Sequence, residues 1–273
     1  MDFSFVSQAL PFDASALPFD LSALLIICPL VFLAGFVDAI AGGGGLISLP
    51  AYLLAGIPPV TAVGTNKLAS AIGTATATFR LWRGGYVSFR KAAPAGIAAI
   101  AGSLIGARLA LIAPEEVFRM LLIVALPIAA AFVMRKRTLR DETDPTMSHG
   151  RRMAIVVTFA FLLGGYDGFY GPGTGTFMLI AFTAVARMSV KEASGEMKVA
   201  NLASNIAALA MFASNGATLI ALGLIAAVFQ TLGSYLGAGR VMKDGTRIVR
   251  PIIVAVLILL FAKVILEQTG VLG

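Results

Sequence analysis

The chain has 273 residues, of which 58% are hydrophobic and 13% are charged, and its mean hydropathy is +0.91. Soluble globular domains are usually about half apolar and about a quarter charged, so this composition predicts a multi-spanning membrane protein and leaves no room for a soluble catalytic domain. The formal net charge of +7 indicates loop orientation rather than nucleic-acid binding, because cytoplasmic loops of membrane proteins carry an excess of Lys and Arg.

Ten apolar stretches follow an acidic N-terminal tail, which we expect to be non-cytoplasmic and to lack a secretory signal. The stretches cover residues 21–41, 45–56, 64–82, 92–113 and 117–134, and then 153–166, 175–187, 197–213, 217–239 and 250–267. A membrane span needs about 20 apolar residues. The second stretch of each half is too short, which favours a re-entrant or broken hairpin over two full crossings, although both remain open.

The two halves of the chain repeat each other. Asp38 corresponds to Asp167 at an offset of 129, and Lys67 corresponds to Lys198 at an offset of 131, so one small insertion reconciles the two offsets. Repeats at this scale predict the architecture better than hydropathy alone. They divide the chain into a first repeat at residues 1–134, a cytoplasmic linker at 135–152 and a second repeat at 153–273.

The basic residues indicate that the second repeat is inverted. Four groups, at 80–91, 135–152, 187–198 and 240–250, hold 17 of the 21 Lys and Arg residues. If all four are cytoplasmic, equivalent loops of the two halves lie on opposite sides of the membrane. The predicted fold is therefore an all-α polytopic membrane protein with two inverted-topology repeats. Each repeat has a Gly-rich broken or re-entrant hairpin plus three transmembrane helices, and both termini are non-cytoplasmic.

A Gly-rich turn precedes the short second stretch of each half, at 42–45 and at 171–176. A helix that begins after such a turn presents free N–H groups and a positive dipole end, which favours an anion site. The alternative is that glycines allow close helix packing and threonines cap the helix. The candidate anion-binding residues here are Gly43, Gly44, Gly45, Gly173, Thr174 and Thr176.

Lys67 and Lys198 stand at the start of the third stretch of each half. An ammonium inside a membrane bundle is costly and usually faces a cavity or a partner, so both are candidates for binding a substrate; anchoring at the interface is the alternative. Asn66, Asn201 and Asn205 lie beside them. These amides either donate to an anion or satisfy the backbone of the broken helices.

Asp38 and Asp167 are the acids that precede the two Gly-rich turns. Three roles are open for each: it neutralises a neighbouring lysine, caps the following helix, or takes up a coupling proton. Tyr166 and Tyr170 flank Asp167, and packing is the favoured interpretation for both.

The chain has little with which to hold a metal or a cofactor. His149 is the only histidine and lies in the charged linker, and Cys28 is the only cysteine and lies in an apolar run. No HExxH, GxSxG or GxxxxGK[ST] motif occurs. We therefore expect no cofactor, no metal and no enzymatic activity.

Three segments resemble a known family: FVDAIAGGGGLISLPAYLLAGIPPVTAVGTNKLAS in the first half, and GGYDGFYGPGTGTFMLIAF followed by EMKVANLASN in the second. They are similar to the sulfite exporter TauE/SafE family, also called the toluene-sulfonate uptake permease family, and the resemblance covers about residues 22–267. It implies a secondary transporter of sulfite or organosulfonates in the bacterial inner membrane. The single Cys28 departs from the thiosulfate-uptake relatives that use conserved cysteines.

The residues and the resemblance predict the same chemistry. A sulfonate has three weakly basic anionic oxygens, which suit several N–H and ammonium donors. We expect a small anionic substrate between the Gly-turn helix ends and the two lysines, exposed to each side of the bilayer by alternating access. An anion channel or a carrier for a non-sulfur organic anion is the alternative. The direction of transport, the coupling ion and a homodimeric state are left open.

Overall fold

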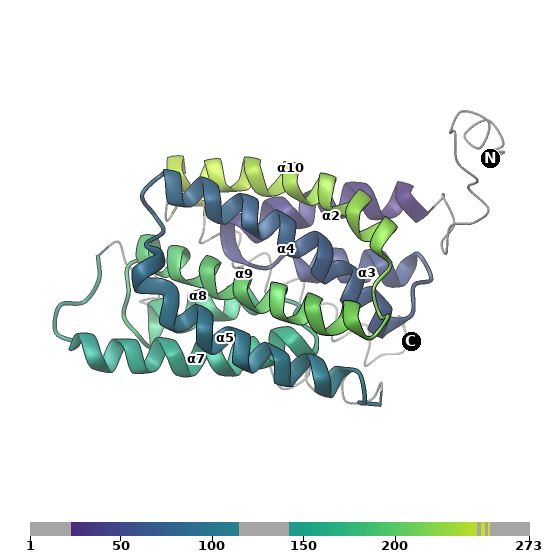
Figure 1. Ribbon diagram of the computed structural model, residues 1–273. Helices are drawn as coiled ribbons and strands as arrows, with labels where there is room; N and C mark the ends of the chain where they lie inside the picture. The colour runs from purple at the N-terminus through teal and green to yellow at the C-terminus, as the bar shows by residue number, and fades with distance from the viewer. Residues whose placement is uncertain (1–22, 115–141, 245–246, 249–250, 252–273) are drawn as a thin grey trace, which may run out of the picture.

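The computed structural model describes residues 23–114, 142–244, 247–248 and 251, which form helices and no strand (Figure 1). The helices are α2 (Ala23–Ala41), α3 (Gly45–Leu54), α4 (Pro59–Arg83), α5 (Phe89–Ala110), α7 (His149–Phe169), α8 (Thr174–Ala184), α9 (Val190–Ser214) and α10 (Ile220–Asp244). The expected stretch at 117–134 and, apart from Pro251, that at 250–267 lie outside the described residues.

The expected all-α membrane architecture is confirmed at this level. A segment in hydrocarbon must satisfy its own backbone polar groups, which favours helices. Within the described part of the chain, four helices, α2, α5, α7 and α10, are long and apolar enough to cross a membrane. In contrast, α3 has 10 residues and α8 has 11. Each is therefore about 15 Å long, which is about half the thickness of the hydrocarbon core of a bilayer.

Four helices, α4, α5, α7 and α9, begin several residues earlier than the apolar pattern predicts. The first turns of α5, α7 and α9 contain charged residues, which the hydropathy pattern excludes. Helix α4 begins at Pro59 rather than at 64, with proline in its first turn. Helix α9 begins at Val190 rather than at 197, and the Ser189 hydroxyl accepts a hydrogen bond from the Glu192 N–H. The lysines of these helices therefore lie in the third turn and not at the start.

Helix α7 begins at His149, inside the segment expected to be the linker at 135–152. The Ser148 hydroxyl caps this helix by accepting a hydrogen bond from the Arg151 N–H. The helix also continues to Phe169, so Asp167 lies in its last turn and not in the following loop. The hydropathy pattern predicts a helix that is too short at both ends, because several of the end residues are charged or glycine.

The two halves of the chain are interleaved. Helix α5 of the first half packs against α7 and α9, while α10 of the second half packs against α2 and α4, as the two groups of helices in Figure 1 show. Glycines bring these helices into backbone contact. A Cβ on Gly102 would lie 2.0 Å from the Phe161 carbonyl oxygen, and one on Gly233 would lie 2.0 Å from the Phe32 carbonyl oxygen. Small residues at both crossings are typical of helix packing in membranes.

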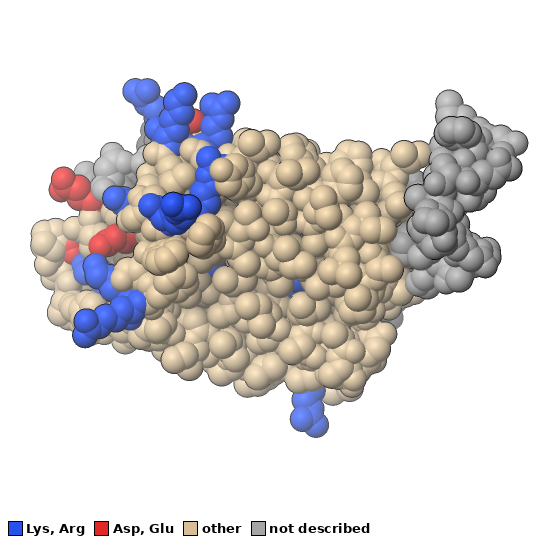
Figure 2. Space-filling model, turned by 45° about the horizontal axis from the view of Figure 1, so that its top comes forward, with Lys and Arg blue, Asp and Glu red and all other residues tan. Residues whose placement is uncertain are grey.

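Charge gathers at one end of the molecule, beside a broad uncharged surface (Figure 2). The α4–α5 loop is at this end, since the Tyr86 hydroxyl reaches the Met242 carbonyl oxygen near the end of α10. The α9–α10 loop lies at the other end of α4, where the Leu219 N–H donates to the Thr65 hydroxyl. The two equivalent loops are therefore at opposite ends of the bundle.

We expect Gly233→Ala to lower the melting temperature of the detergent-solubilised protein. The new methyl group would overlap the α2 backbone, and overpacking of this kind costs about 1–3 kcal/mol. Gly150→Ala is the matched control, because a Cβ there meets nothing within 4 Å and alanine favours the helix. Equal melting temperatures for the two variants would contradict the close α2–α10 crossing.

Candidate functional site

Two buried ion pairs join the halves of the chain, and they are crossed. Lys67 Nζ of α4 lies 2.8 Å from Asp167 Oδ2 of α7, and Lys198 Nζ of α9 lies 3.0 Å from Asp38 Oδ2 of α2. Each lysine therefore pairs with the aspartate of the other half. The side chains are 2% and 4% exposed in the first pair, and 0% and 10% in the second. Burial of both partners makes each pair costly to break, since separation leaves a charge without compensation.

The Lys67–Asp167 pair is embedded in a polar network contributed by α9. Lys67 Nζ also donates to Asn205 Oδ1 at 3.1 Å, and Asn205 Nδ2 donates to Asn201 Oδ1 at 3.1 Å. The Ser204 hydroxyl donates to Asp167 Oδ2 at 2.7 Å. These residues share one face of α9 because they are three or four positions apart. The network orients both members of the ion pair.

In the Lys198–Asp38 pair the lysine is fully buried. Lys198 Nζ donates to the backbone carbonyl oxygen of Asp38 as well as to its carboxylate. Thr74 Oγ1 lies 3.5 Å from the same carboxylate oxygen. Of the three roles open for the aspartates, the neutralisation of a lysine is the one that this geometry displays, for both Asp38 and Asp167.

The two Gly-rich turns meet back to back. Gly42 has a φ of +76°, and a Cβ there would lie 2.3 Å from Gly175 Cα; a Cβ on Gly175 would lie 2.5 Å from Gly42 Cα. A Cβ on Gly44 would lie 2.6 Å from the Ala34 carbonyl oxygen. A larger residue at Gly42 or Gly175 would force the two turns apart, and one at Gly44 would push its turn away from α2. Close packing is therefore one reason for glycine at these positions.

The threonines of the second turn donate to backbone carbonyl oxygens in this conformation. Thr174 Oγ1 lies 2.8 Å from the Gly171 carbonyl oxygen, and Thr176 Oγ1 lies 2.8 Å from the Ala41 carbonyl oxygen of the first turn. Neither helix has a side-chain cap: the N-cap of α3 is Gly44 and that of α8 is Gly173. The hydroxyl protons are thus directed to the turns.

A small cavity of about 20 Å³ lies between the turns and the lysine of α4. Its lining residues are Asp38, Gly42, Gly45, Asn66, Lys67, Ser70, Asp167, Gly171, Gly175, Asn201 and Asn205. This volume holds about one water molecule. A larger anion enters only when the turns or the ion pairs move.

The structure thus brings together only some of the predicted site residues. Gly45, Asn66, Lys67, Asn201 and Asn205 line the cavity with both aspartates. The members of the predicted set that stay out of its wall are Gly43, Gly44, Gly173, Thr174, Thr176 and Lys198.

One lining residue of the cavity and one unpaired atom beside it were not among the sequence-based predictions. Ser70 lines it, and the repeat offset of 131 that relates it to Asn201 is the signal that identifies it. Asn66 Oδ1 is buried without a hydrogen-bond partner among the described residues. A buried amide in this state is a natural contact for water or a ligand.

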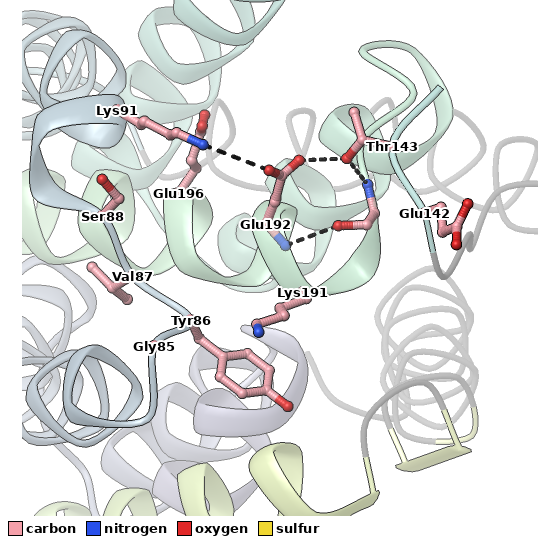
Figure 3. Close-up of a pocket in the computed structure, with 11 residues that line it drawn as sticks. Gly85, Tyr86, Val87, Ser88, Lys91, Glu142, Thr143, Lys191, Glu192 and Glu196 are labelled. Atoms are coloured by element: carbon pink, nitrogen blue, oxygen red, sulfur yellow. Dashed lines mark hydrogen bonds and ion pairs between the residues drawn. The ribbon is translucent and has the colours of Figure 1, made fainter. Parts of the chain in front are cut away.

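A second cavity, of about 440 Å³, opens at the charged end between the α4–α5 loop and the start of α9 (Figure 3). Lys91 Nζ lies 3.8 Å from Glu192 Oε1 on its wall, and Thr143 donates to the same carboxylate. Its lining includes lysines and glutamates, so it is not selective for anions. It shares no residue with the ion-pair cavity. Nothing in the sequence pattern predicts this cavity, because it forms where residues 142–143 come close to the α4–α5 loop and to the start of α9, which are distant in the sequence.

Residues 27–264 match the family model of the sulfite exporter TauE/SafE family. The chain belongs to this family. Members similar to it include the probable membrane transporter protein ORF9 of a Sinorhizobium species, 37% identical over 87% of this chain and 90% of its own length. A probable membrane transporter protein of Haemophilus influenzae is 35% identical over 90% and 95%, and YfcA of Escherichia coli, likewise a probable membrane transporter protein, is 32% identical over 88% and 89%. No solved structure matches the chain significantly.

The expected family is therefore confirmed, and the chain is a membrane transporter of the TauE/SafE family. The crossed ion pairs and the glycine turns fall within the residues that the family model matches. They also join its two halves, which makes them the candidate centre of the transporter.

A double-mutant cycle tests the crossed pairing. We expect Lys67→Met and Asp167→Asn each to destabilise the solubilised protein by about 3–5 kcal/mol, because each leaves an unpaired buried charge. The double variant should lose less than the sum of the two, with a coupling of about 0.5–3 kcal/mol. Thermal and denaturant unfolding provide the measurement.

The control cycle combines Lys67→Met with Asp38→Asn, and we expect a clearly smaller coupling there. Asp38 belongs to the same half as Lys67 but is bound by Lys198. A larger coupling between Lys67 and Asp38 than between Lys67 and Asp167 would show pairing within each half and would contradict the crossed arrangement.

Proposed function

We propose that this chain is a secondary transporter that moves a small sulfur-containing anion, sulfite or an organosulfonate, across the bacterial inner membrane by alternating access. The observation that carries the proposal is a buried ammonium, Lys67, that faces a polar cavity between the two halves. Intramembrane lysines of this kind mark substrate pathways.

The donors around the cavity suit a sulfonate or sulfite. Gly45 is the first residue of α3, and a helix N-terminus presents free N–H groups and a positive dipole end. The amides of Asn66, Asn201 and Asn205 also line the cavity. An anion with three oxygens accepts hydrogen bonds from several such donors at once, in addition to the charge of Lys67.

The arrangement of the halves supports alternating access. The α4–α5 loop and the α9–α10 loop lie at opposite ends of the bundle, as an inverted repeat of 1–134 and 153–273 around a cytoplasmic linker at 135–152 requires. The short helices α3 and α8 meet through their Gly-rich turns, as in re-entrant hairpins with apices at the midplane. The site would open to one side or the other as the halves rock.

Binding is the first test. We expect a sulfonate or sulfite to raise the melting temperature of the purified protein in a screen of sulfite, sulfate, thiosulfate, sulfoacetate, taurine, acetate and phosphate. A ligand at 100 times its Kd stabilises by about 2.7 kcal/mol. Lys67→Met should abolish the shift and transport, whereas Lys91→Met, with a lysine side chain that is 65% exposed, should keep both.

Transport in proteoliposomes completes this test, because exchange of labelled for unlabelled anion distinguishes a carrier from a channel. Normal transport by a folded Lys67→Met protein would refute the role of this lysine. A melting temperature that no anion raises, at millimolar concentration, would point to another substrate class.

Membrane orientation is tested separately, in a Cys28→Ala background. We expect Ser88→Cys, in the α4–α5 loop, to react with an impermeant maleimide only from the cytoplasmic side, because the basic end should be cytoplasmic. Ala213→Cys, near the α9–α10 loop, should react only from outside; both native residues are exposed. Labelling of both positions from the same side would contradict the inverted repeat.

A further inference from the structure

The two crossed ion pairs are not equivalent. Lys67, Asp167 and Asp38 line the central cavity, whereas Lys198 is fully buried and does not. Lys198 also holds Asp38 through both its carboxylate and its backbone carbonyl oxygen. Lys67 is therefore the ammonium that an anion in the cavity can reach, and Asp167 is the carboxylate that such an anion would leave unpaired. Lys198 stays bound to Asp38 and links α9 to α2.

The charge balance at Lys67 constrains what can bind there. In the empty site, the positive charge of Lys67 is compensated by Asp167. A monovalent anion that binds Lys67 adds a negative charge and separates Asp167 from its cation. An unpaired charge in this environment costs several kcal/mol, and a carboxylate without its cation in a low dielectric favours the neutral acid. One proton on Asp167 restores neutrality.

We propose that Asp167 is the proton-binding residue of the transporter and that one proton crosses with one monovalent anion. The proton comes from water on the open side and forms an O–H bond on the Asp167 carboxylate. The ion pair with Lys67 breaks, and the Lys67 ammonium binds the anion. On the other side the anion leaves, Asp167 returns its proton to water and the ion pair re-forms. This inference rests on the proposed anion transport.

The hydroxyl of Ser204 is placed to accommodate both states of Asp167. Ser204 Oγ lies 2.7 Å from Asp167 Oδ2 and 3.0 Å from the Asn201 carbonyl oxygen. A hydroxyl has one proton to donate and also accepts. When Asp167 is ionised, Ser204 donates to it; when Asp167 is protonated, Ser204 accepts from it and donates to Asn201. The position equivalent to Ser204 in the first repeat is Gly73, and the hydroxyl beside Asp38 is instead that of Thr74, at the longer distance of 3.5 Å.

The other groups around Asp167 leave the charge balance unchanged. From α9, Ser204 and the neutral amide of Asn205 face the pair, and from α4 the facing charge is Lys67. On α7 itself the neighbouring titratable groups are the phenols of Tyr166 and Tyr170, and Tyr166 donates to the Pro172 carbonyl oxygen. Helices α5 and α8 also pack against α7. The α5 residues in contact with the glycines of the last turns of α7 are uncharged, namely Ala99, Gly102, Ser103 and Gly106, and α8 has no charged residue.

Asp38 is the remaining charged residue in the cavity wall, and Lys198 neutralises it. The empty site and the site loaded with both proton and anion thus have the same net charge. A site with only the anion or only the proton has an uncompensated charge and should not change sides. This favours electroneutral cotransport of a monovalent anion over a divalent one.

The test uses full-length protein in proteoliposomes with labelled methanesulfonate, a monovalent sulfonate. We expect an acidic exterior to drive accumulation, by about tenfold for one pH unit at equilibrium with one proton per anion. A potassium diffusion potential set by valinomycin should not change the accumulation, and a protonophore should abolish it.

Asp167→Asn isolates the proton-binding step. Its empty site has an unpaired Lys67 and should not change sides without an anion. We therefore expect exchange of labelled for unlabelled methanesulfonate that no longer depends on pH, and no accumulation driven by a pH gradient. Asp244→Asn is the matched control, since Asp244 pairs with Arg240 at the charged end. Monodisperse elution and a cooperative melting transition establish that each variant is folded.

The outcomes separate the two proposals. Absence of exchange by folded wild-type protein would refute methanesulfonate transport and the coupling with it. Exchange without any response to the pH gradient would overturn the coupling alone, whether or not the variant folds. Accumulation that persists in Asp167→Asn, or that is lost in Asp38→Asn but not in Asp167→Asn, would overturn the assignment to Asp167.

Discussion

The central physical constraint on this protein is that charges inside a membrane bundle must be compensated. Among the described residues two lysines and two aspartates are buried, and each lysine is paired with an aspartate from the other half of the chain. Because the pairs are crossed, neither half can neutralise its own charges. The same interactions that make burial tolerable also hold α4 against α7 and α9 against α2. Any movement that separates the halves must therefore involve these contacts, or replace them with a ligand.

Close backbone packing determines where those charges meet. The Gly-rich turns approach each other so closely that a Cβ on either Gly42 or Gly175 would overlap the other turn. Without this approach, α3 and α8 would not bring their N-terminal ends to the same cavity as the ion pairs. Gly102 and Gly233 likewise allow close backbone contact at the helix crossings, where α5 and α10 pack against helices of the opposite half. Glycine thus supports the site through packing, in addition to the exposed N–H groups that an anion would use.

Equivalent residues of the two halves have different surroundings. Lys67 faces the cavity beside two asparagines, whereas Lys198 is enclosed and binds Asp38 twice. A symmetric pair of sites would hold two anions, but of the two buried lysines in the described residues only Lys67 lines the cavity. Duplication supplies the scaffold, and the change from Gly73 in one half to Ser204 in the other gives the two aspartates different hydroxyl partners, Thr74 for Asp38 and Ser204 for Asp167.

Much of this protein is determined by local sequence. Apolar composition requires membrane helices, and the cost of intramembrane charge singles out Lys67, Lys198, Asp38 and Asp167 as the residues to explain. The helix starts at Pro59, His149 and Val190 are also local, but they depend on proline and serine capping that a hydropathy pattern does not register.

What only the tertiary structure decided is the partner of each charge. Along the chain, Asp38 is nearer to Lys67, and Asp167 is nearer to Lys198. In the folded protein Lys67 instead pairs with Asp167, and Lys198 with Asp38, and α5 and α10 each pack against helices of the opposite half. The small cavity, the second cavity at the charged end and the difference between the two lysines follow from the same packing. The physical reason is that ion pairing depends on distance in space, which close contacts between residues more than 100 positions apart determine.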